Sequence, residues 1–185
     1  MDGYDSSFVF CLAGSGQRFV DEGITTPKYL LKINKQGQSL IEKSIECFNF
    51  DKKTLVLFIC NRKHIFYKKT LLSILKKLNI SFKLIFIDDT NGQAVTAYLA
   101  CKYILKNFDN LTNKPIAFFN GDSILKSRNF VSLISCMHNS MGLIDVFESK
   151  ENIYSYIKAK GNYVSDIIEK KVISNKASSG LYLFL

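Results

Sequence analysis

The sequence predicts an α/β domain with three layers, α/β/α, built around a mixed and mainly parallel sheet. Apolar runs of strand length alternate with segments of helical periodicity up to about residue 122. Repeated strand–helix–strand units of this kind form parallel sheets with helices on both faces. In addition, four predicted strands end in polar sequences, "LAGSGQR", "CNRKH", "DDTNGQ" and "NGDS". Ligands bind at the carboxyl ends of the strands in such sheets, so the sequence places a functional site there.

The individual elements of this alternation are recognised by burial pattern and by helix caps. Predicted buried strands cover residues 6–14, 53–61, 81–90 and 114–122. Predicted helices cover residues 39–50, 65–80 and 93–108. The strands are short, continuous apolar runs, which are typical of strands covered on both faces. The first helix has Ser39 at its start and Glu42 three residues later, a capping-box pattern. The second has a lysine-rich outer face.

The chain changes character after Ser140. Short β-branched or aromatic runs are separated by turn residues, and "AKGNYV" is typical of a hairpin turn. These runs cover residues 142–149, 153–161, 162–170 and 179–185. We expect them to extend the sheet in a mixed way and to cover one end of the site.

Length and composition limit the class of protein. A chain of 185 residues fits one domain, 1–185, and 47% hydrophobic residues disfavour disorder. No stretch approaches the roughly 20 uncharged apolar residues of a membrane span, and the acidic N-terminus is no secretory signal, so a cytoplasmic protein without a membrane partner is expected. Five cysteines without close spacing indicate reduced thiols.

The net charge of +9 has two interpretations. The lysines are spread over many segments and rarely alternate with aromatic residues, which disfavours a nucleic-acid partner. Solvated helix faces account for the charge, and a basic surface around a small polyanionic substrate is the second interpretation. His64 and His138 have no metal-ligand spacing around them, so structural or surface positions are expected.

The loop after the first strand has the composition of a phosphate-binding loop. Gly14 and Gly16 allow positive φ angles and close approach of backbone N–H groups to phosphate oxygens. Arg18 adds a planar cation, Pro27 fixes the backbone, and Lys28 adds a mobile point charge. A tight strand-to-loop turn with surface cations is the alternative that this loop alone leaves open.

Two other phosphate-binding motifs are absent. Nothing matches the Walker A pattern G-x-x-x-x-G-K-[ST]. The dinucleotide pattern G-x-G-x-x-G fails because Phe19 stands at the third glycine position, and the second strand ends in "CNRK" where a ribose-binding acid is expected. The sequence therefore disfavours a dehydrogenase.

Four motifs together resemble a known enzyme family. They are, in chain order, "LAGSGQRF" with "TPKYLLKI", then "TNGQAVTA", "FFNGDS" and "IIEKKVISNKASSGLYLF". The chain resembles, from Phe8 to Phe184, nucleotidyltransferases that activate sugar phosphates and phosphocholine-type alcohols as nucleoside diphosphates. It is most similar to the compact branch found in capsule and surface-polysaccharide gene clusters. The resemblance implies a Rossmann-like fold of the nucleotide-diphospho-sugar transferase type.

The resemblance also implies a nucleotide-binding set. It consists of Leu12, Ala13, Gly14, Ser15, Gly16, Gln17, Arg18, Lys28, Asn91, Gly92, Gln93 and Thr96. Within it, Arg18 and Lys28 are the expected catalytic residues, because they would neutralise charge on the α-phosphate and the departing pyrophosphate. No protein nucleophile is needed, since a phosphate oxygen of the acceptor attacks. CTP is the expected nucleotide.

Metal and acceptor sites follow from the later motifs. The resemblance implies that Asp122 holds Mg²⁺, an ion that accepts a carboxylate with phosphate oxygens and waters. Asn120 and Gly121 are expected on the substrate side, where they also shape the turn. Glu169 and Lys170 are expected to bind a phosphorylated small-molecule acceptor. An ordinary turn at Asp122 and an exposed charge run at "EKK" are the alternatives.

Two rival functions remain open from the sequence. Asp88 and Asp89 could hold the metal of a glycosyltransferase, although this leaves Arg18 unexplained. Relatives usually continue beyond the "GLYLF" strand and often have a second metal-binding aspartate there, whereas this chain stops at Leu185. A truncated, non-catalytic nucleotide-binding remnant is therefore the second rival. An uncovered final strand would expose apolar surface and favour a homo-oligomer.

Overall fold

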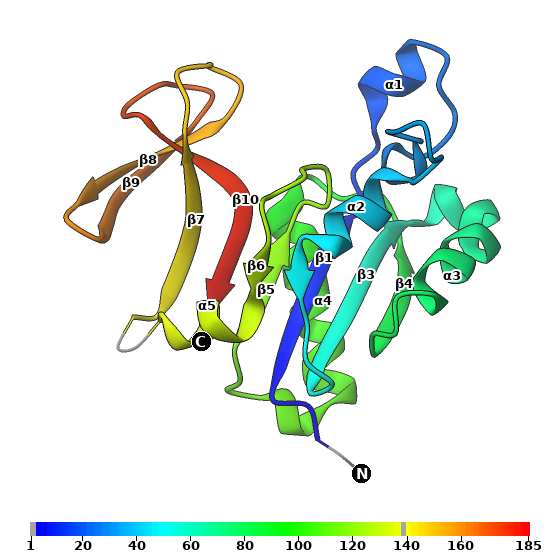
Figure 1. Cartoon of the computed structure of the whole chain (residues 1–185), viewed down its shortest axis with the longest axis horizontal. Helices are drawn as coiled ribbons and strands as arrows, with labels where there is room; N and C mark the ends of the chain where they lie inside the picture. The colour runs from blue at the N-terminus through cyan, green and yellow to red at the C-terminus, as the bar shows by residue number, and fades with distance from the viewer. Residues whose placement is uncertain (1–2, 138–139) are drawn as a thin grey trace.

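The computed structural model describes residues 3–137 and 140–185, so His138 lies outside the described residues. Its main feature is an eight-stranded sheet with the order β4-β3-β1-β5-β10-β8-β9, in which β7 also pairs with β10 (Figure 1). The parallel part consists of β1 (Ser6–Leu12), β3 (Thr54–Asn61), β4 (Phe82–Ile87) and β5 (Ile116–Phe119). All four strands lie inside the predicted ranges, and their carboxyl ends meet at one edge of the sheet.

The remaining strands make the sheet mixed, as predicted. They are β7 (Gly142–Glu148), β8 (Ser155–Lys160), β9 (Tyr163–Glu169) and β10 (Lys176–Phe184). β10 runs antiparallel to β5, β7 and β8, and β8 and β9 form the predicted hairpin. The β7–β10 register shifts between Ser178 and Tyr182, and Gly180 between them has a φ of 84°. This irregularity lets β10 pair with β5 at one end and with the β8–β9 hairpin at the other (Figure 1).

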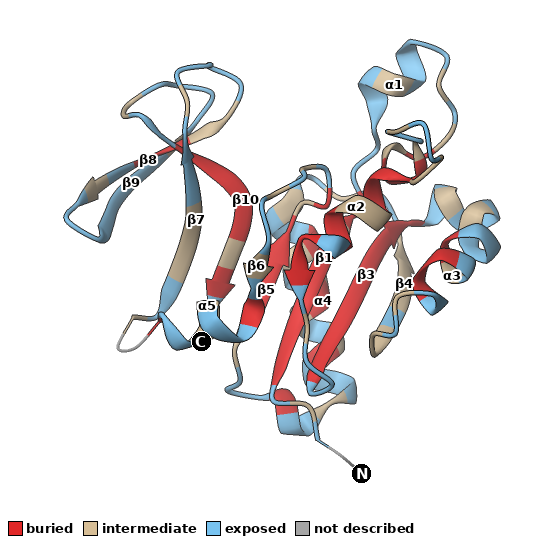
Figure 2. Ribbon diagram, viewed as in Figure 1, coloured by how far each residue is buried: buried red, intermediate tan, exposed pale blue. Residues whose placement is uncertain are grey.

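Helices cover both faces of the sheet, which confirms the three-layer prediction. The helices are α2 (Leu40–Glu46), α3 (Lys68–Lys76), α4 (Gln93–Asn107) and α5 (Phe130–Ser135). Along β1, Phe8 and Phe10 pack into the cluster that contains residues of α2, α3 and α5, whereas Val9 packs into the cluster that contains residues of α4. All residues of β3 are buried, and Figure 2 shows this core along β1 and β3.

Three segments differ from the predicted elements. The first predicted helix ends at Glu46, because Phe48–Asn49 forms a short strand β2 that pairs with β6 (Arg128–Asn129). The second helix is preceded by a 3₁₀ segment, η2 (Arg62–Tyr67). The glycine-rich loop leads into a five-residue helix, α1 (Gln17–Asp21), and η1 (Lys28–Leu30) follows it. In the described part of the chain, no helix is long and apolar enough to cross a membrane.

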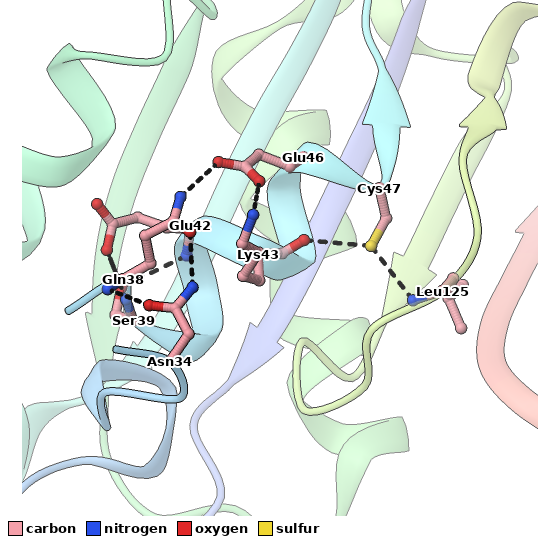
Figure 3. Close-up of polar contacts among 8 residues, drawn as sticks. All are labelled: Asn34, Gln38, Ser39, Glu42, Lys43, Glu46, Cys47 and Leu125. Atoms are coloured by element: carbon pink, nitrogen blue, oxygen red, sulfur yellow. Dashed lines mark hydrogen bonds and ion pairs between the residues drawn. The ribbon is translucent and has the colours of Figure 1, made fainter. Parts of the chain in front are cut away.

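The predicted capping box of α2 is present (Figure 3). The backbone N–H of Ser39 donates to the Glu42 carboxylate at 2.6 Å, and the Ser39 hydroxyl accepts from the Glu42 N–H at 3.5 Å. At the other end of α2, the Cys47 thiol accepts a hydrogen bond from the Leu125 N–H at 3.2 Å (Figure 3). Helix α2 is therefore fixed at one end by its own cap and at the other to the segment that follows β5.

Candidate active site

A cleft of about 590 Å³ opens at the carboxyl ends of the parallel strands. Its lining includes most of the site residues predicted from the sequence. These are Leu12, Gly14, Ser15, Gly16, Gln17, Arg18, Lys28, Gly92, Gln93, Thr96, Asn120, Gly121 and Asp122. Segments that are separated by up to about a hundred residues in the chain thus meet around one space.

The glycine-rich loop forms the outer wall of this cleft. Gly16 has a φ of 63°, in the left-handed region that favours glycine, and it precedes α1. Among the described residues, the N–H groups of Gly14, Ser15 and Gly16 donate no hydrogen bond. Figure 1 shows the segment with α1 extending beyond the sheet. These exposed N–H groups can donate hydrogen bonds to an anion without breaking any contact of the fold.

Two cations lie on this wall in different surroundings. The Lys28 Nζ lies 3.1 Å from Asp122 Oδ2 and 5.7 Å from the centre of the Phe19 ring. Both partners of this ion pair are about two-fifths exposed. Arg18 has no ion pair within the described ranges 3–137 and 140–185. The cleft therefore contains one cation tethered to an acid and one that is unpaired.

The turn that carries Asp122 is held by packing and by α2. Gly121 has a φ of 67°, and a Cβ at this position would lie 2.5 Å from Leu12 Cδ2, so any larger residue would be strained and would displace the Leu12 side chain. The Ser44 hydroxyl of α2 lies 2.9 Å from the Ser123 carbonyl oxygen and 3.4 Å from that of Gly121. A buried serine thus holds the backbone on both sides of the Asp122 carboxylate.

The opposite wall is the turn between β4 and α4. Gly92 ends this turn with a φ of 92°, and Gln93 is the first residue of α4. The hydroxyl groups of Thr90 and Thr96 lie 2.8 Å apart, and Thr96 is only 2% exposed. Cys11 contacts the Gln93 amide, and burial raises the pKa of this thiol to about 12. Cys11 therefore stays a neutral thiol at the base of this wall.

Four predicted residues do not line the cleft. Ala13 is buried behind the loop, and its carbonyl oxygen accepts a hydrogen bond from Asn61 Nδ2 at 3.0 Å. Asn91 is exposed next to Gly92. Glu169 and Lys170 are exposed at the end of β9 and form an ion pair with each other at 3.1 Å. Their proposed roles stay predictions.

Asp88 and Asp89, the acids of the rival glycosyltransferase hypothesis, also lie outside the lining. Asp88 Oδ1 lies 3.0 Å from Arg62 Nε, and Asp89 pairs with the Lys63 ammonium. Hydrogen bonds from Lys63 and Asn61 lower the pKa of Asp89. No group of three or more potential metal-ligating side chains occurs in the part of the chain that the structure describes.

Two of the lining residues that sequence reasoning missed, Tyr29 and His64, lie against each other. Their rings meet edge to face at 5.6 Å. The His64 Nδ1 and the Tyr29 hydroxyl are buried without a hydrogen-bond partner among the described residues, although the Cys60 thiol lies beside the hydroxyl. Burial lowers the pKa of His64. The charge of Asp89 opposes this shift by raising the pKa, and the charge of Lys63 adds to it by lowering the pKa. The only available signal was the position of His64 just after a strand end.

Comparison with known proteins gives a consistent result. The family described as nucleotidyl transferase matches residues 10–185. No curated protein sequence matches the chain. Among solved structures, a nucleoside-diphosphate-sugar pyrophosphorylase from Vibrio cholerae RC9 is similar with a TM-score of 0.74 and 25% identity, over 96% of this chain and 72% of that one.

Two further structures share the fold at lower identity. One is a putative glucose-1-phosphate thymidylyltransferase from Bacillus anthracis, with a TM-score of 0.74 and 18% identity over 98% of this chain and 71% of that chain. The other is an inositol-1-phosphate CTP transferase from T. maritima, with a TM-score of 0.73 and 14% identity over 98% and 71%. The sheet, its covering helices and the match to residues 10–185 lead to one conclusion: the chain belongs to the nucleotidyl transferase family and is a nucleotidyltransferase.

Proposed function

We propose that the single domain 1–185 transfers CMP from CTP to a phosphorylated small molecule and releases pyrophosphate. The acceptor is a sugar phosphate or a small phosphorylated alcohol or amide. The observation that supports this proposal most is the meeting of three features in one cleft: unpaired backbone N–H groups, two cations and an exposed carboxylate. The resemblance to the compact branch supports CTP and a role of the product in capsule or surface-polysaccharide biosynthesis. The reaction is proposed to take place in the cytoplasm.

The glycine-rich loop is the proposed binding site of the triphosphate. Unpaired N–H groups at Gly14, Ser15 and Gly16 offer hydrogen-bond donors to phosphate oxygens. The unpaired guanidinium of Arg18 offers a planar fork that matches two of these oxygens. A triphosphate bound here would meet donors that the fold leaves unused.

The reaction needs positioning and charge neutralisation rather than a protein nucleophile. A phosphate oxygen of the acceptor attacks the α-phosphorus of the nucleotide, and the bond from the α-phosphorus to the bridging oxygen breaks. Pyrophosphate leaves with the electron pair of that bond. Arg18 and Lys28 offset the negative charge that builds on the leaving group and on the α-phosphate oxygens, which is how such transfers are commonly catalysed.

Asp122 is the proposed ligand of Mg²⁺. The donor set fits this ion, because Mg²⁺ is usually held by one or two carboxylates together with substrate phosphates and waters. The Asp122 carboxylate is 43% exposed and faces the wall that offers the phosphate donors. When bound, the ion would neutralise charge on the α-phosphate. The Lys28 ammonium is the counter-charge of this carboxylate in the free protein, so nucleotide binding would release Lys28 toward the phosphates.

The acceptor is proposed to bind on the β5–β10 side of the cleft. Asn120 lines the cleft, and its Oδ1 is buried without a partner among the described residues. A hydroxyl group of an acceptor would satisfy this oxygen. Glu169 and Lys170 are proposed to bind the acceptor from the end of β9. The final strand β10 is mostly buried and paired on both sides, so it does not expose the apolar surface expected from the sequence. A homo-oligomer is proposed instead on the exposed apolar residues of β9, including Val164 and Ile167.

A two-step experiment tests the proposal. Thermal unfolding is first measured with each of the four nucleoside triphosphates and Mg²⁺, and CTP is expected to raise the melting temperature most. Pyrophosphate release is then assayed with CTP and a panel of phosphorylated sugars, polyols and phosphocholine. Stabilisation by CTP without pyrophosphate from any acceptor would indicate a non-catalytic binding domain. Consumption of a nucleotide sugar without pyrophosphate would favour the glycosyltransferase hypothesis, which the position of Asp88 and Asp89 outside the cleft lining disfavours.

A further inference from the structure

The turn between β4 and α4 is fixed by one threonine. The Thr90 carbonyl oxygen accepts a hydrogen bond from the Gly92 N–H at 2.9 Å. The hydroxyl of the same residue donates to the Gly92 carbonyl oxygen at 3.3 Å. This hydroxyl also lies 2.8 Å from the hydroxyl of Thr96. Thr90 is half-buried and lines the cleft, but none of the motifs assigns it a role.

The direction of these hydrogen bonds follows from the number of protons. Each threonine hydroxyl has a single proton to donate. A carbonyl oxygen can only accept, so the proton of Thr90 points to Gly92. With the Thr90 proton on Gly92, the contact between the two hydroxyl groups, in which either oxygen can be the donor, uses the proton of Thr96. A directed chain results, from Thr96 to Thr90 and from Thr90 to Gly92.

This chain uses up the hydrogen-bonding capacity of Gly92. Its N–H already donates to the Thr90 carbonyl. Its carbonyl oxygen has two lone pairs. One accepts from the Thr90 hydroxyl, and the other is the acceptor that an N-cap residue provides to the first turn of a helix. A nucleotide base against this turn therefore finds the Gly92 backbone already occupied. The residue that follows Gly92, Gln93, lines the cleft, and its side-chain amide offers both donors and acceptors.

We propose that Thr90 is a positioning residue for nucleotide choice, which acts by holding Gly92 so that the Gln93 amide faces the base. The inference rests on the proposed binding of a nucleotide in this cleft. Gly92 has a φ of 92° and a ψ of 172°, a conformation available almost only to glycine. Without the hydrogen bond from the Thr90 hydroxyl to the Gly92 carbonyl oxygen, the turn can relax to another conformation. Cys11 of β1 lies beside the Gln93 side chain in the cleft lining.

Binding measurements on three variants test this role. Thr90→Val keeps the branched shape and removes the hydroxyl, whereas Thr90→Ser keeps the hydroxyl. Thr112→Val makes the same change at an exposed site in the loop after η3. Dissociation constants are measured by calorimetry, in the presence of Mg²⁺, for the four nucleoside triphosphates and for inorganic triphosphate. Inorganic triphosphate should bind to the N–H groups and cations of the glycine-rich loop, but it has no base that could contact Gln93.

The expected result separates base reading from phosphate binding. Thr90→Val should weaken the preferred nucleotide about tenfold, the effect of losing one good hydrogen bond, and reduce its preference over the other three. It should leave the affinity for inorganic triphosphate within about twofold of wild type. Thr90→Ser should restore both preference and affinity, and Thr112→Val should change neither. Melting temperatures establish that the variants fold, and Thr90→Ala replaces Thr90→Val if the latter does not.

Three outcomes would overturn the inference. One is wild-type base preference in Thr90→Val, another is an equal loss of affinity for inorganic triphosphate, and the third is a wild-type protein without any base preference. A wild-type protein that prefers a nucleotide other than CTP would refute the proposal that CTP is the substrate. The Thr90 variants are then compared with wild type on the nucleotide that wild type prefers. The two hypotheses therefore fail in different measurements.

Discussion

Lys28 and Asp122 form an ion pair across the cleft, with 3.1 Å between Nζ and Oδ2, although 94 positions separate them in the chain. One residue is a predicted catalytic cation and the other is the predicted metal ligand. Their pairing in the free protein means that each neutralises the other, and in the proposed reaction a nucleotide and a metal ion would separate them. Because both side chains are about two-fifths exposed, the pair contributes little to stability and can open at little cost.

Removal of the cationic head group of Lys28 should abolish most of the turnover. Lys28→Met keeps the length of the side chain but removes the charge that is proposed to face the leaving pyrophosphate. We expect kcat to fall by about 10²- to 10³-fold, with the melting temperature nearly unchanged. The matched control is Lys69→Met on the exposed face of α3. Steady-state pyrophosphate release measures both, and equal rates for wild type and Lys28→Met would refute the role.

The guanidinium of Arg18 should matter for affinity as well as for rate. It has no ion pair among the described residues, so a phosphate would be its first charged partner. Arg18→Gln should weaken binding of the preferred nucleotide by about tenfold or more. Calorimetry with and without added salt checks this result. The control Arg62→Gln removes a cation that already pairs with Asp88 outside the cleft, and it should bind the nucleotide as wild type does.

Asp122 and Asp88 should differ in their effect on metal dependence. Asp122→Asn removes the charge proposed to hold Mg²⁺, and the Mg²⁺ concentration required for half-maximal pyrophosphate release should rise by about tenfold or more. Asp88→Asn removes an acid that is held by Arg62 and should leave this concentration unchanged. The opposite pattern, with only Asp88→Asn affected, would favour the glycosyltransferase hypothesis. A Mg²⁺ titration at saturating nucleotide measures both variants.

Two glycines with similar backbone angles should respond differently to alanine. Gly121 has a φ of 67°, and its added Cβ would lie 2.5 Å from Leu12 Cδ2. Gly161 in the β8–β9 turn has a φ of 60° with nothing within 4 Å. Gly161→Ala should therefore cost about 1 kcal/mol from backbone strain alone, whereas Gly121→Ala should cost about 2–4 kcal/mol because packing is disturbed too. Urea unfolding of both variants measures the difference, and equal losses would contradict the packing argument.

The protonation of His64 should reduce stability at mildly acidic pH. Burial lowers its pKa in the folded state, so the unfolded chain binds the proton more readily. The neutral ring therefore contributes stability that is present above its unfolded pKa of about 6.5 and is lost as the pH falls through the lower folded value. The free energy of unfolding is measured between pH 7.5 and 5.0 for wild type and His64→Gln. The difference between them should shrink on acidification, and a constant difference would contradict this assignment.

Much of the fold follows from local patterns in the sequence. The buried strands and the Ser39–Glu42 cap are set by burial on both faces and by hydrogen bonds over three residues, and both were predicted. The split of the predicted helix 39–50 was not, because Phe48 and Asn49 pair with residues some 80 positions away. Local periodicity cannot reveal a partner at that distance.

The residues of the candidate site also fall into those that local sequence predicts and those that it does not. The glycines and cations of the first loop were predicted because their types match phosphate chemistry, and the structure brings most of them to one cleft. Thr90 and His64 were not predicted as cleft residues. His64 has no motif around it, and Thr90 begins the motif "TNGQAVTA" but has a small hydroxyl side chain that does not by itself indicate a role. Their positions depend on how η2, η1 and the β4–α4 turn meet, which only the assembled fold determines.

The Ser44 hydroxyl donates its single proton to the backbone around Asp122, mainly to the Ser123 carbonyl oxygen at 2.9 Å, with that of Gly121 at 3.4 Å. The orientation of the Asp122 carboxylate therefore depends on a helix that does not line the cleft. Helix α2 begins at a cap whose strength depends on Glu42 and ends against the segment that carries Leu125. With Asp122 as the proposed Mg²⁺ ligand, substitutions that loosen α2 without unfolding the protein should appear first as weaker metal binding. A screen for lost activity would then identify residues of α2 that lie away from the chemistry, and their effect would be partly recovered by raising the Mg²⁺ concentration.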